Sequence, residues 1–178
     1  MRRALILVLL LAGCGFLKRT PNTFYTLDTI PGTARATIAG TPVGIDGIEL
    51  PPGLDRREVT ARAADHKLDV RGHHQWASPL EDMVTHTLSF NLASRLPEGM
   101  VVLPGQAKPA AMRSLYVTFE DLAPGPDNVF VLDARWTMGE MVRHERITVP
   151  LTSAESAAVV AAMSQALGQL SDRIAAAL

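Results

Sequence analysis

The sequence predicts an α+β fold, a single domain in which a mostly antiparallel sheet carries two helices packed on one face. Several segments alternate apolar and polar residues and are separated by turn residues, as strands do. Two other segments, near residues 80–96 and 156–178, carry apolar residues at helical spacing. Adjacent strand segments have the pattern of hairpins, so we expect antiparallel pairing. The length of the chain suits one domain.

The first half of the chain predicts a strand, a second strand and a hairpin. Thr23–Asp28, "TFYTLD", is rich in β-branched and aromatic residues and predicts the first strand. Residues 43–50, "VGIDGIEL", alternate and predict a second strand with a bulge at Gly47. Residues 58–63 and 67–71 predict the two arms of a hairpin. The Pro- and Gly-containing segment 30–42 and the segment "PPGLDRR" predict loops.

Both helices have a start signal and an apolar stripe. Ser78, Pro79 and Glu81 have the spacing of a capping box with proline at the first helical position, and the stripe that follows ends near Leu96. Thr152–Glu155 is a second capping box. After it, one side of a long C-terminal helix is lined by Val159, Val160, Met163, Leu167, Leu170, Ile174 and Leu178.

Between the two helices the sequence predicts strands. "MVVLP" predicts a short apolar strand, and residues 113–122 alternate with Leu115, Val117 and Phe119 on one face. Residues 128–138 and 140–151, with Gly139 and Glu140 between their apolar parts, predict a hairpin.

The N-terminus has the parts of a secretory signal peptide. A basic start is followed by the apolar run Ala4–Leu11, two small residues and Cys14, which is the only cysteine. The apolar run is far shorter than the roughly 20 residues that span a bilayer as a helix. Leu11–Cys14 resembles the bacterial lipobox, which implies cleavage between Gly13 and Cys14 and a lipid on the Cys14 sulfur. The alternatives are an ordinary cleavable signal peptide with an accidental cysteine, or a short membrane-anchoring helix.

We therefore expect residues 1–13 to be a signal peptide, 14–22 a lipidated tether and 23–178 the folded domain. Gly15 follows the cysteine where aspartate is the familiar inner-membrane retention signal, which favours the outer membrane, facing the periplasm. Without Arg2 and Arg3, the 17 basic residues fall to 15 against 18 acidic ones. This balance argues against nucleic acid as a partner.

Three further motifs resemble one family. They comprise Tyr25 and Leu27, then Pro51, Leu54, Asp55 and Arg56 with Thr60 and Arg62, and finally Trp76, Ala77, Pro79 and Leu80. With the lipobox, they resemble the ABC-type transport auxiliary lipoproteins. The resemblance departs at Gly53, Gln75 and Ser78, where family members often carry other residues.

The resemblance implies a non-catalytic subunit of an ABC-linked intermembrane lipid transport system. Its partner would be an MCE-type periplasmic protein, which the lipid anchor would tether to the outer membrane. Partners of this kind form rings, so a homo-oligomeric ring is a further expectation. Loops on rigid scaffolds often carry function, and we expect partner contacts at Pro51, Leu54, Asp55, Arg56, Arg57 and Trp76. Trp76 has a second interpretation, packing of its ring against the helix that follows.

The remaining alternatives are a ligand-binding protein and an enzyme. A lipid or other small apolar ligand could occupy a pocket between helix and sheet, lined by Leu88, Leu92, Met163 or Leu167. The five histidines show no metal-ligand spacing, and no nucleophile, P-loop or dinucleotide motif is present. We therefore expect no enzymatic activity, no metal and no cofactor.

Overall fold

The computed structural model describes residues 20–34, 40–62, 67–125 and 127–178. The predicted leader, Gly13, Cys14 and most of the predicted tether lie outside the described residues, as does the predicted turn at residues 64–66. The fold predictions for the domain can therefore be compared with the structure, whereas the lipid anchor stays a prediction.

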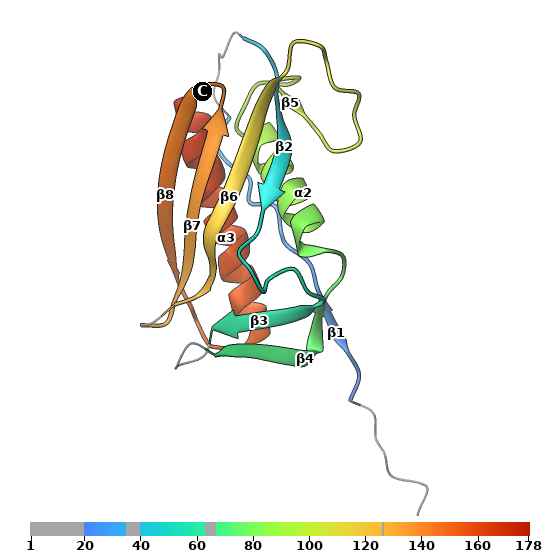
Figure 1. Cartoon of the computed structure of the whole chain (residues 1–178), viewed down its shortest axis with the longest axis vertical. Coiled ribbons are helices and arrows are strands. Elements are labelled where there is room, and N and C mark those ends of the chain that lie inside the picture. The colour runs from blue at the N-terminus through green and yellow to red at the C-terminus, as the bar shows by residue number, and fades with distance from the viewer. Residues whose placement is uncertain (1–19, 35–39, 63–66, 126) are drawn as a thin grey trace, which may run out of the picture.

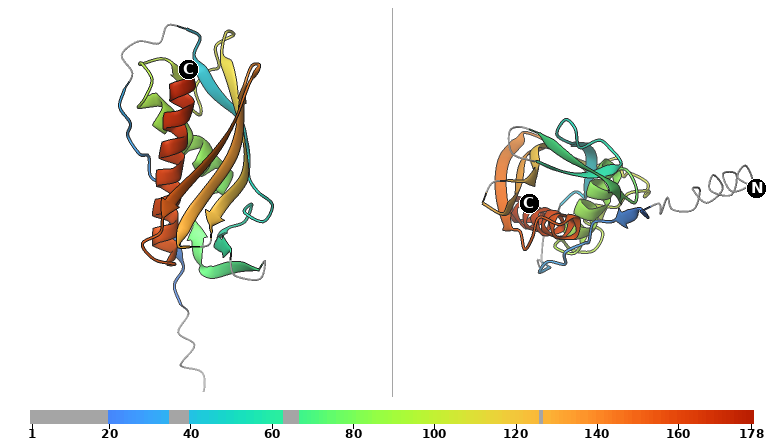
Figure 2. Two further views of the ribbon diagram at one scale, coloured as in Figure 1. Left: turned by 90° about the vertical axis from the view of Figure 1, so that its left-hand side faces the viewer. Right: turned by 90° about the horizontal axis from the view of Figure 1, so that it is seen from below.

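The described chain forms two sheets and two helices. The five-stranded sheet has the order β5-β2-β6-β7-β8, and the three-stranded sheet has the order β1-β4-β3. Helices α2 (Leu80–Ala93) and α3 (Ser156–Ala177) cover one face of the larger sheet, and the smaller sheet lies across one end of the molecule (Figures 1 and 2). The strands are β1 (Thr23–Tyr25), β2 (Val43–Glu49), β3 (Glu58–Arg62), β4 (Leu68–Trp76), β5 (Val101–Val102), β6 (Arg113–Pro124), β7 (Val129–Met138) and β8 (Met141–Pro150). The prediction of a single α+β domain with two helices on one face is confirmed.

Both sheets are mixed, which the hairpin pattern did not indicate. β2 runs parallel to β5 and β6, and β1 runs parallel to β4, while the pairs β3–β4, β6–β7 and β7–β8 are antiparallel. The physical reason is the connection between β2 and β6. The chain passes through the small sheet and helix α2 before it returns, and such a long crossover brings the next strand back in the same direction.

Local features of the strands follow the sequence. The predicted bulge is present, because the β2–β6 register shifts between Ile45 and Gly47. A side chain at Gly47 would begin 2.9 Å from the ring of Tyr116, so the absence of a side chain lets that ring lie on the strand. On β6 the predicted residues Leu115, Val117 and Phe119 are all buried.

The predicted capping boxes are wrong in detail, although both helices exist. Helix α2 has Pro79 as its N-cap with ψ 133°, and no side chain caps it. Pro79 itself has an extended ψ, so the helix begins one residue later than the box predicts, at Leu80, and Ser78 precedes the N-cap. Helix α3 has Glu155 as its N-cap, again without a side-chain cap. Helix α2 also ends earlier than predicted, with Ser94 as its C-cap.

The helical stripes form the core with the sheet. From Val159 to Ile174, every predicted stripe residue of α3 is buried, and Leu178 is half-buried. The positions proposed to line a ligand pocket are at most 3 % exposed and belong to one core cluster: Leu88, Leu92, Met163 and Leu167. Their packing against other side chains is that of an ordinary protein interior.

Candidate functional site

The three resemblance motifs meet at the end of the molecule that carries the small sheet. A pocket of about 400 Å³ opens there between β1, the loop before β3, and the junction of β4 with α2. It is lined by Phe24, Asp55, Arg56, Arg57 and the segment Trp76–Leu80. Three segments that are far apart in the sequence, at residues 24, 55–57 and 76–80, thus form one surface, which we call the small-sheet pocket.

Two adjacent backbone N–H groups hold this pocket together. Trp76 donates from its backbone nitrogen to the Arg57 carbonyl oxygen at 2.8 Å, and Ala77 donates to the Tyr25 carbonyl oxygen at 2.9 Å. The Tyr25 hydroxyl also bonds to Nδ1 of His74 at 2.8 Å, with the two rings stacked. The Trp-Ala pair therefore fixes both the loop and β1 to the end of β4.

The loop 51–57 has a turn dictated by its sequence. Leu54 donates from its backbone nitrogen to the Pro51 carbonyl oxygen at 3.2 Å, which closes a four-residue turn. Pro52 and Gly53 are its central residues, and Gly53 has φ +89°, a value that favours glycine. Leu54 then turns into the core, which leaves the next three residues, Asp55, Arg56 and Arg57, exposed.

The six predicted partner-contact residues separate into two groups. Leu54 and Trp76 are 7 % and 6 % exposed and belong to the core cluster, so the packing interpretation of Trp76 is the one the structure supports. Pro51 is half-buried, and Asp55, Arg56 and Arg57 are exposed around the pocket. The buried pair holds the loop in place, and partner contact by the exposed residues stays a prediction.

The two arginines of the pocket have no polar partners for their guanidinium groups among the described residues. Within the part of the chain that the structure describes, no hydrogen bond or ion pair involves the guanidinium of Arg56 or Arg57. Beside them lies Phe24, 58 % exposed on β1, with Trp76, Ala77 and Pro79 forming apolar lining. Two available cations next to an apolar hollow provide a site for an anion that carries an apolar part.

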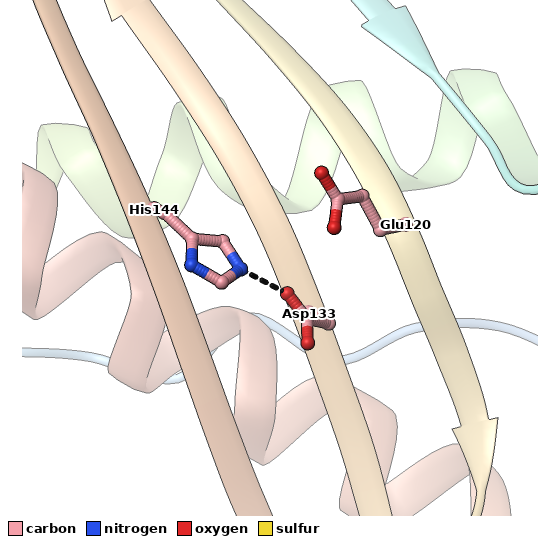
Figure 3. Close-up of side chains that lie close together, drawn as sticks. All are labelled: Glu120, Asp133 and His144. Carbon is pink, nitrogen blue, oxygen red and sulfur yellow. Dashed lines mark hydrogen bonds and ion pairs between the residues drawn. The ribbon is translucent and has the colours of Figure 1, made fainter.

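A second polar cluster lies on the open face of the large sheet. Glu120, Asp133 and His144 come from the adjacent strands β6, β7 and β8, and their donor atoms lie within 4.8 Å of one another (Figure 3). His144 Nε2 lies 2.5 Å from Asp133 Oδ1, and Arg146 donates to Asp133 Oδ2 at 2.7 Å. Arg135 donates to Glu120 at 2.5 Å. Arginines already neutralise both carboxylates, so the cluster works as an ion-pair network.

Two carboxyl groups on this sheet have shifted pKa values. Burial acts to raise the pKa of Asp133, but hydrogen bonds from His144 and Arg146, together with their charges, outweigh it and leave this pKa below the usual value. Hydrogen bonds from Lys108 and Ser114 likewise lower the pKa of Asp46. Both carboxyls are therefore charged at neutral pH and already occupied by donors.

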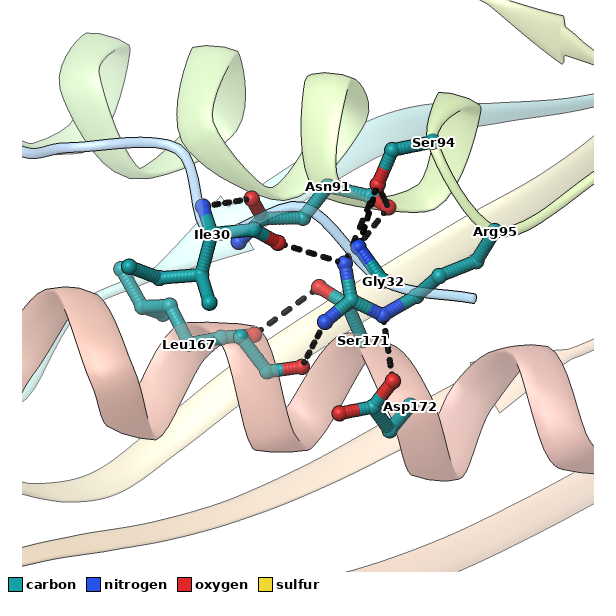
Figure 4. Close-up of polar contacts among 9 residues, drawn as sticks. Ile30, Gly32, Asn91, Ser94, Arg95, Leu167, Ser171 and Asp172 are labelled. Carbon is teal, nitrogen blue, oxygen red and sulfur yellow. Dashed lines mark hydrogen bonds and ion pairs between the residues drawn. The ribbon is translucent and has the colours of Figure 1, made fainter. Parts of the chain in front are cut away.

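A buried arginine holds the segment after β1 onto the helices. Arg95, whose side chain is 3 % exposed, donates to Asp172 Oδ1 at 2.6 Å and to the carbonyl oxygens of Ile30, Asn91 and Gly168 at 2.8–3.1 Å (Figure 4). The backbone of Asp28 donates to Ser164 Oγ at 3.0 Å. β1 is consequently shorter than predicted, because the chain leaves the small sheet and crosses helix α3. We call residues 28–32 the strap.

Sequence reasoning missed both Arg95 and the Asp133 network. Arg95 lies just after helix α2, where the sequence pattern shows only the end of the apolar stripe near Leu96. Nothing in that pattern indicates that the Arg95 side chain is buried. The Asp133 network depends on the β7–β8 register, which pairs Asp133 with Arg146 and Arg135 with His144. Charges that alternate along both arms of a predicted hairpin are the signal that could have indicated it.

The family assignment comes from comparison with known proteins. A family model described as the ABC-type transport auxiliary lipoprotein component matches residues 25–175. The chain belongs to this family. The matched range contains strands β2 to β8, helix α2, all but the last two residues of α3, and every residue that lines the small-sheet pocket except Phe24. The resemblance seen in the motifs therefore extends over nearly the whole described domain of this auxiliary lipoprotein.

Curated relatives of this auxiliary lipoprotein come from two enteric bacteria. It is 26 % identical over 143 residues to proteins named intermembrane transport lipoprotein PqiC from Escherichia coli K12 and from Shigella flexneri. Each alignment covers 78 % of this chain and 75 % of the relative.

Solved structures share the fold of this auxiliary lipoprotein. A crystal structure of an uncharacterized protein superimposes with a TM-score of 0.73 at 21 % identity, over 89 % of this chain and 99 % of that one. Protein XCC0632 from Xanthomonas campestris, of the family DUF330, gives a TM-score of 0.61 at 17 % identity, over 85 % and 92 %. In the described part of the chain, no helix has both the length and the apolar character to cross a membrane.

Proposed function

We propose that this chain is a non-catalytic lipoprotein subunit of an ABC- and MCE-linked intermembrane lipid transport system. Its Cys14 lipid anchors it in the outer membrane, and its domain holds the periplasmic MCE-type assembly at that membrane. The match of the family model to residues 25–175, nearly the whole described fold, is the observation that supports this proposal most strongly. The name of the PqiC relatives, intermembrane transport lipoproteins, agrees with it.

The mechanism is tethering. A domain confined to one membrane raises the local concentration of its binding partner there, without any chemical step. The carboxyl groups with shifted pKa values support this non-catalytic role, because Asp46 and Asp133 are each engaged by cationic side chains and hydrogen-bond donors.

The main alternative is a lipoprotein that itself encloses a lipid or another small apolar ligand between helix and sheet. The four side chains expected to line such a pocket instead contact one another and their neighbours within a single core cluster. This packing favours tethering over an enclosed ligand.

Affinity capture tests the proposal. The chain from residue 14 carrying Cys14→Ser keeps every described residue and lacks the lipid, so it serves as a soluble bait. We expect it to capture the MCE-type protein of its own host, and to capture nothing comparable from a strain lacking that protein. A folded bait that captures no MCE-type protein would contradict the proposed function.

A further inference from the structure

The end of the molecule nearest the predicted anchor has an unusual surface. Six large apolar residues are exposed in the described chain, and three of them lie on the small sheet. Phe24 on β1 is 58 % exposed, while Leu68 and Val70 on β4 are 43 % and 42 % exposed. Leu68 and Val70 alternate along one strand and so project from the same face of it.

Cations surround these apolar side chains. Arg56 and Arg57 line the small-sheet pocket with Phe24, and Lys67 directly precedes Leu68. None of the three has an ion-pair partner among the described residues. Arg71, the other cation of β4, is different, because it bonds to Asp69, Ser156 and the Ala154 carbonyl oxygen. The nearby acidic residues of the described chain are Asp55, Glu58 and Asp69, and Asp69 is already paired with Arg71. The three cations without an ion-pair partner therefore outnumber the two remaining carboxylates.

The course of the chain brings this surface to the membrane. β1 begins at Thr23, nine residues after Cys14. Nine residues span at most about 30 Å when fully extended, and about 15–18 Å as a flexible coil. Figure 1 shows the chain leaving the fold at the small-sheet end, away from the β7–β8 turn. If Cys14 is lipidated as proposed above, the small sheet lies closer to the leaflet than any other element.

We propose that the small sheet is a second membrane contact, at which Phe24, Leu68 and Val70 enter the interface of a phospholipid leaflet and Arg56 and Arg57 bind lipid phosphates. Apolar side chains flanked by cations are the combination by which proteins lie on anionic membrane surfaces. The contact orients the domain: the helices and the large sheet point into the periplasm, where a protein partner approaches. This inference rests on the proposed anchor, and it concerns lipid contact rather than the MCE partner.

Vesicle flotation with the Cys14→Ser chain from residue 14 tests this contact. We expect binding to vesicles of phosphatidylethanolamine and phosphatidylglycerol (3:1), weaker binding to phosphatidylcholine alone, and a loss of binding as NaCl rises to about 0.5 M. The double variant Arg56→Gln/Arg57→Gln should partition about 30-fold more weakly, and Phe24→Ser about tenfold more weakly. Arg56→Lys/Arg57→Lys, which keeps both charges, should bind nearly as the parent does.

A matched control is available at the opposite end. Val142 on β8 is 57 % exposed, close to the value for Phe24, so Val142→Ser should leave vesicle binding unchanged. Circular dichroism melting confirms that each variant is folded. Absence of parent binding to anionic vesicles, or equal binding by the Gln and Val142 variants, would overturn the inference.

The capture experiment separates this inference from the proposed function. If vesicle binding is absent while the MCE-type protein is captured, only the membrane contact is wrong. If vesicles bind and no MCE-type protein is captured, the tethering function is wrong. If the Gln double variant loses the protein partner and keeps full vesicle binding, the arginines contact protein, and the lipid-phosphate assignment is overturned.

Discussion

The charged carboxylate of Asp133 stabilises the fold through ion pairs, and those ion pairs in turn favour its charged form. Its carboxylate is almost completely covered, with a side chain 10 % exposed, and it accepts from His144 and Arg146. Removing such an acceptor leaves its donors without a charged partner. Because His144 and Arg146 are themselves 47 % and 62 % exposed, water compensates for part of that loss.

Asp133→Asn should therefore lower the free energy of unfolding at pH 7 by about 1 kcal/mol. The folded-state pKa of Asp133 lies below its unfolded value of about 3.8, so this stabilisation is complete above that value and disappears as pH falls through the lower folded-state pKa. Urea unfolding at several pH values measures the difference, which should shrink toward pH 3. A difference that stays constant from pH 7 to pH 3 would contradict this account, and Glu120→Gln, on an exposed pair, provides a control with a small effect.

The guanidinium of Arg95 joins both helices, α2 and α3, to the strap. Its bonds reach the carbonyl oxygens of Ile30 on the strap, of Asn91 on α2 and of Gly168 on α3. Gly168 lets the strap approach, because a side chain there would begin 2.9 Å from Ile30 Cβ. The strap continues into β1, so this point also holds the small sheet to the helices.

Arg95→Ala should destabilise the domain by about 3–4 kcal/mol, because it leaves buried carbonyl oxygens and the Asp172 carboxylate without a donor. Asp172→Asn should cost no more than about 1 kcal/mol, since the Asp172 side chain is 58 % exposed. Chemical unfolding followed by circular dichroism measures both. Equal costs for the two variants would mean that the ion pair, rather than the carbonyl contacts, carries the stabilisation.

At the scale of the whole molecule, the proposal is that a lipid on Cys14 attaches the folded domain to a membrane. Cys14→Ser should move the full-length protein out of the lipidated membrane fraction, because the only thiol that can carry the lipid is removed. Gly15→Asp is the matched control: it should keep the lipid and move to the inner-membrane fraction. Fractionation and intact-mass measurement follow both variants, and a native protein with an unmodified Cys14 would contradict the anchor.

Much of the architecture could be predicted from local patterns. The stripes of both helices, the bulge at Gly47 and the hairpin around Gly139 depend on neighbouring residues, so periodicity and turn chemistry were sufficient. The caps were not predictable in the same way. Pro79 is extended and is itself the N-cap of α2. Helix α3 begins at Ser156, three residues later than an N-cap at Thr152 predicts.

The sequence by itself determined the class of fold, the apolar faces of its helices and strands, and the family to which its motifs point. Only the tertiary structure decided that the sheets are two and mixed, that Leu54 belongs to the core, and that Arg56 and Arg57 lie beside Phe24 with no ion-pair partner among the described residues. The physical reason is distance along the chain. Periodicity reports the environment of each residue within its own element. Pairing direction, burial and polar partners depend instead on residues that the fold brings together from 19 to 136 positions apart.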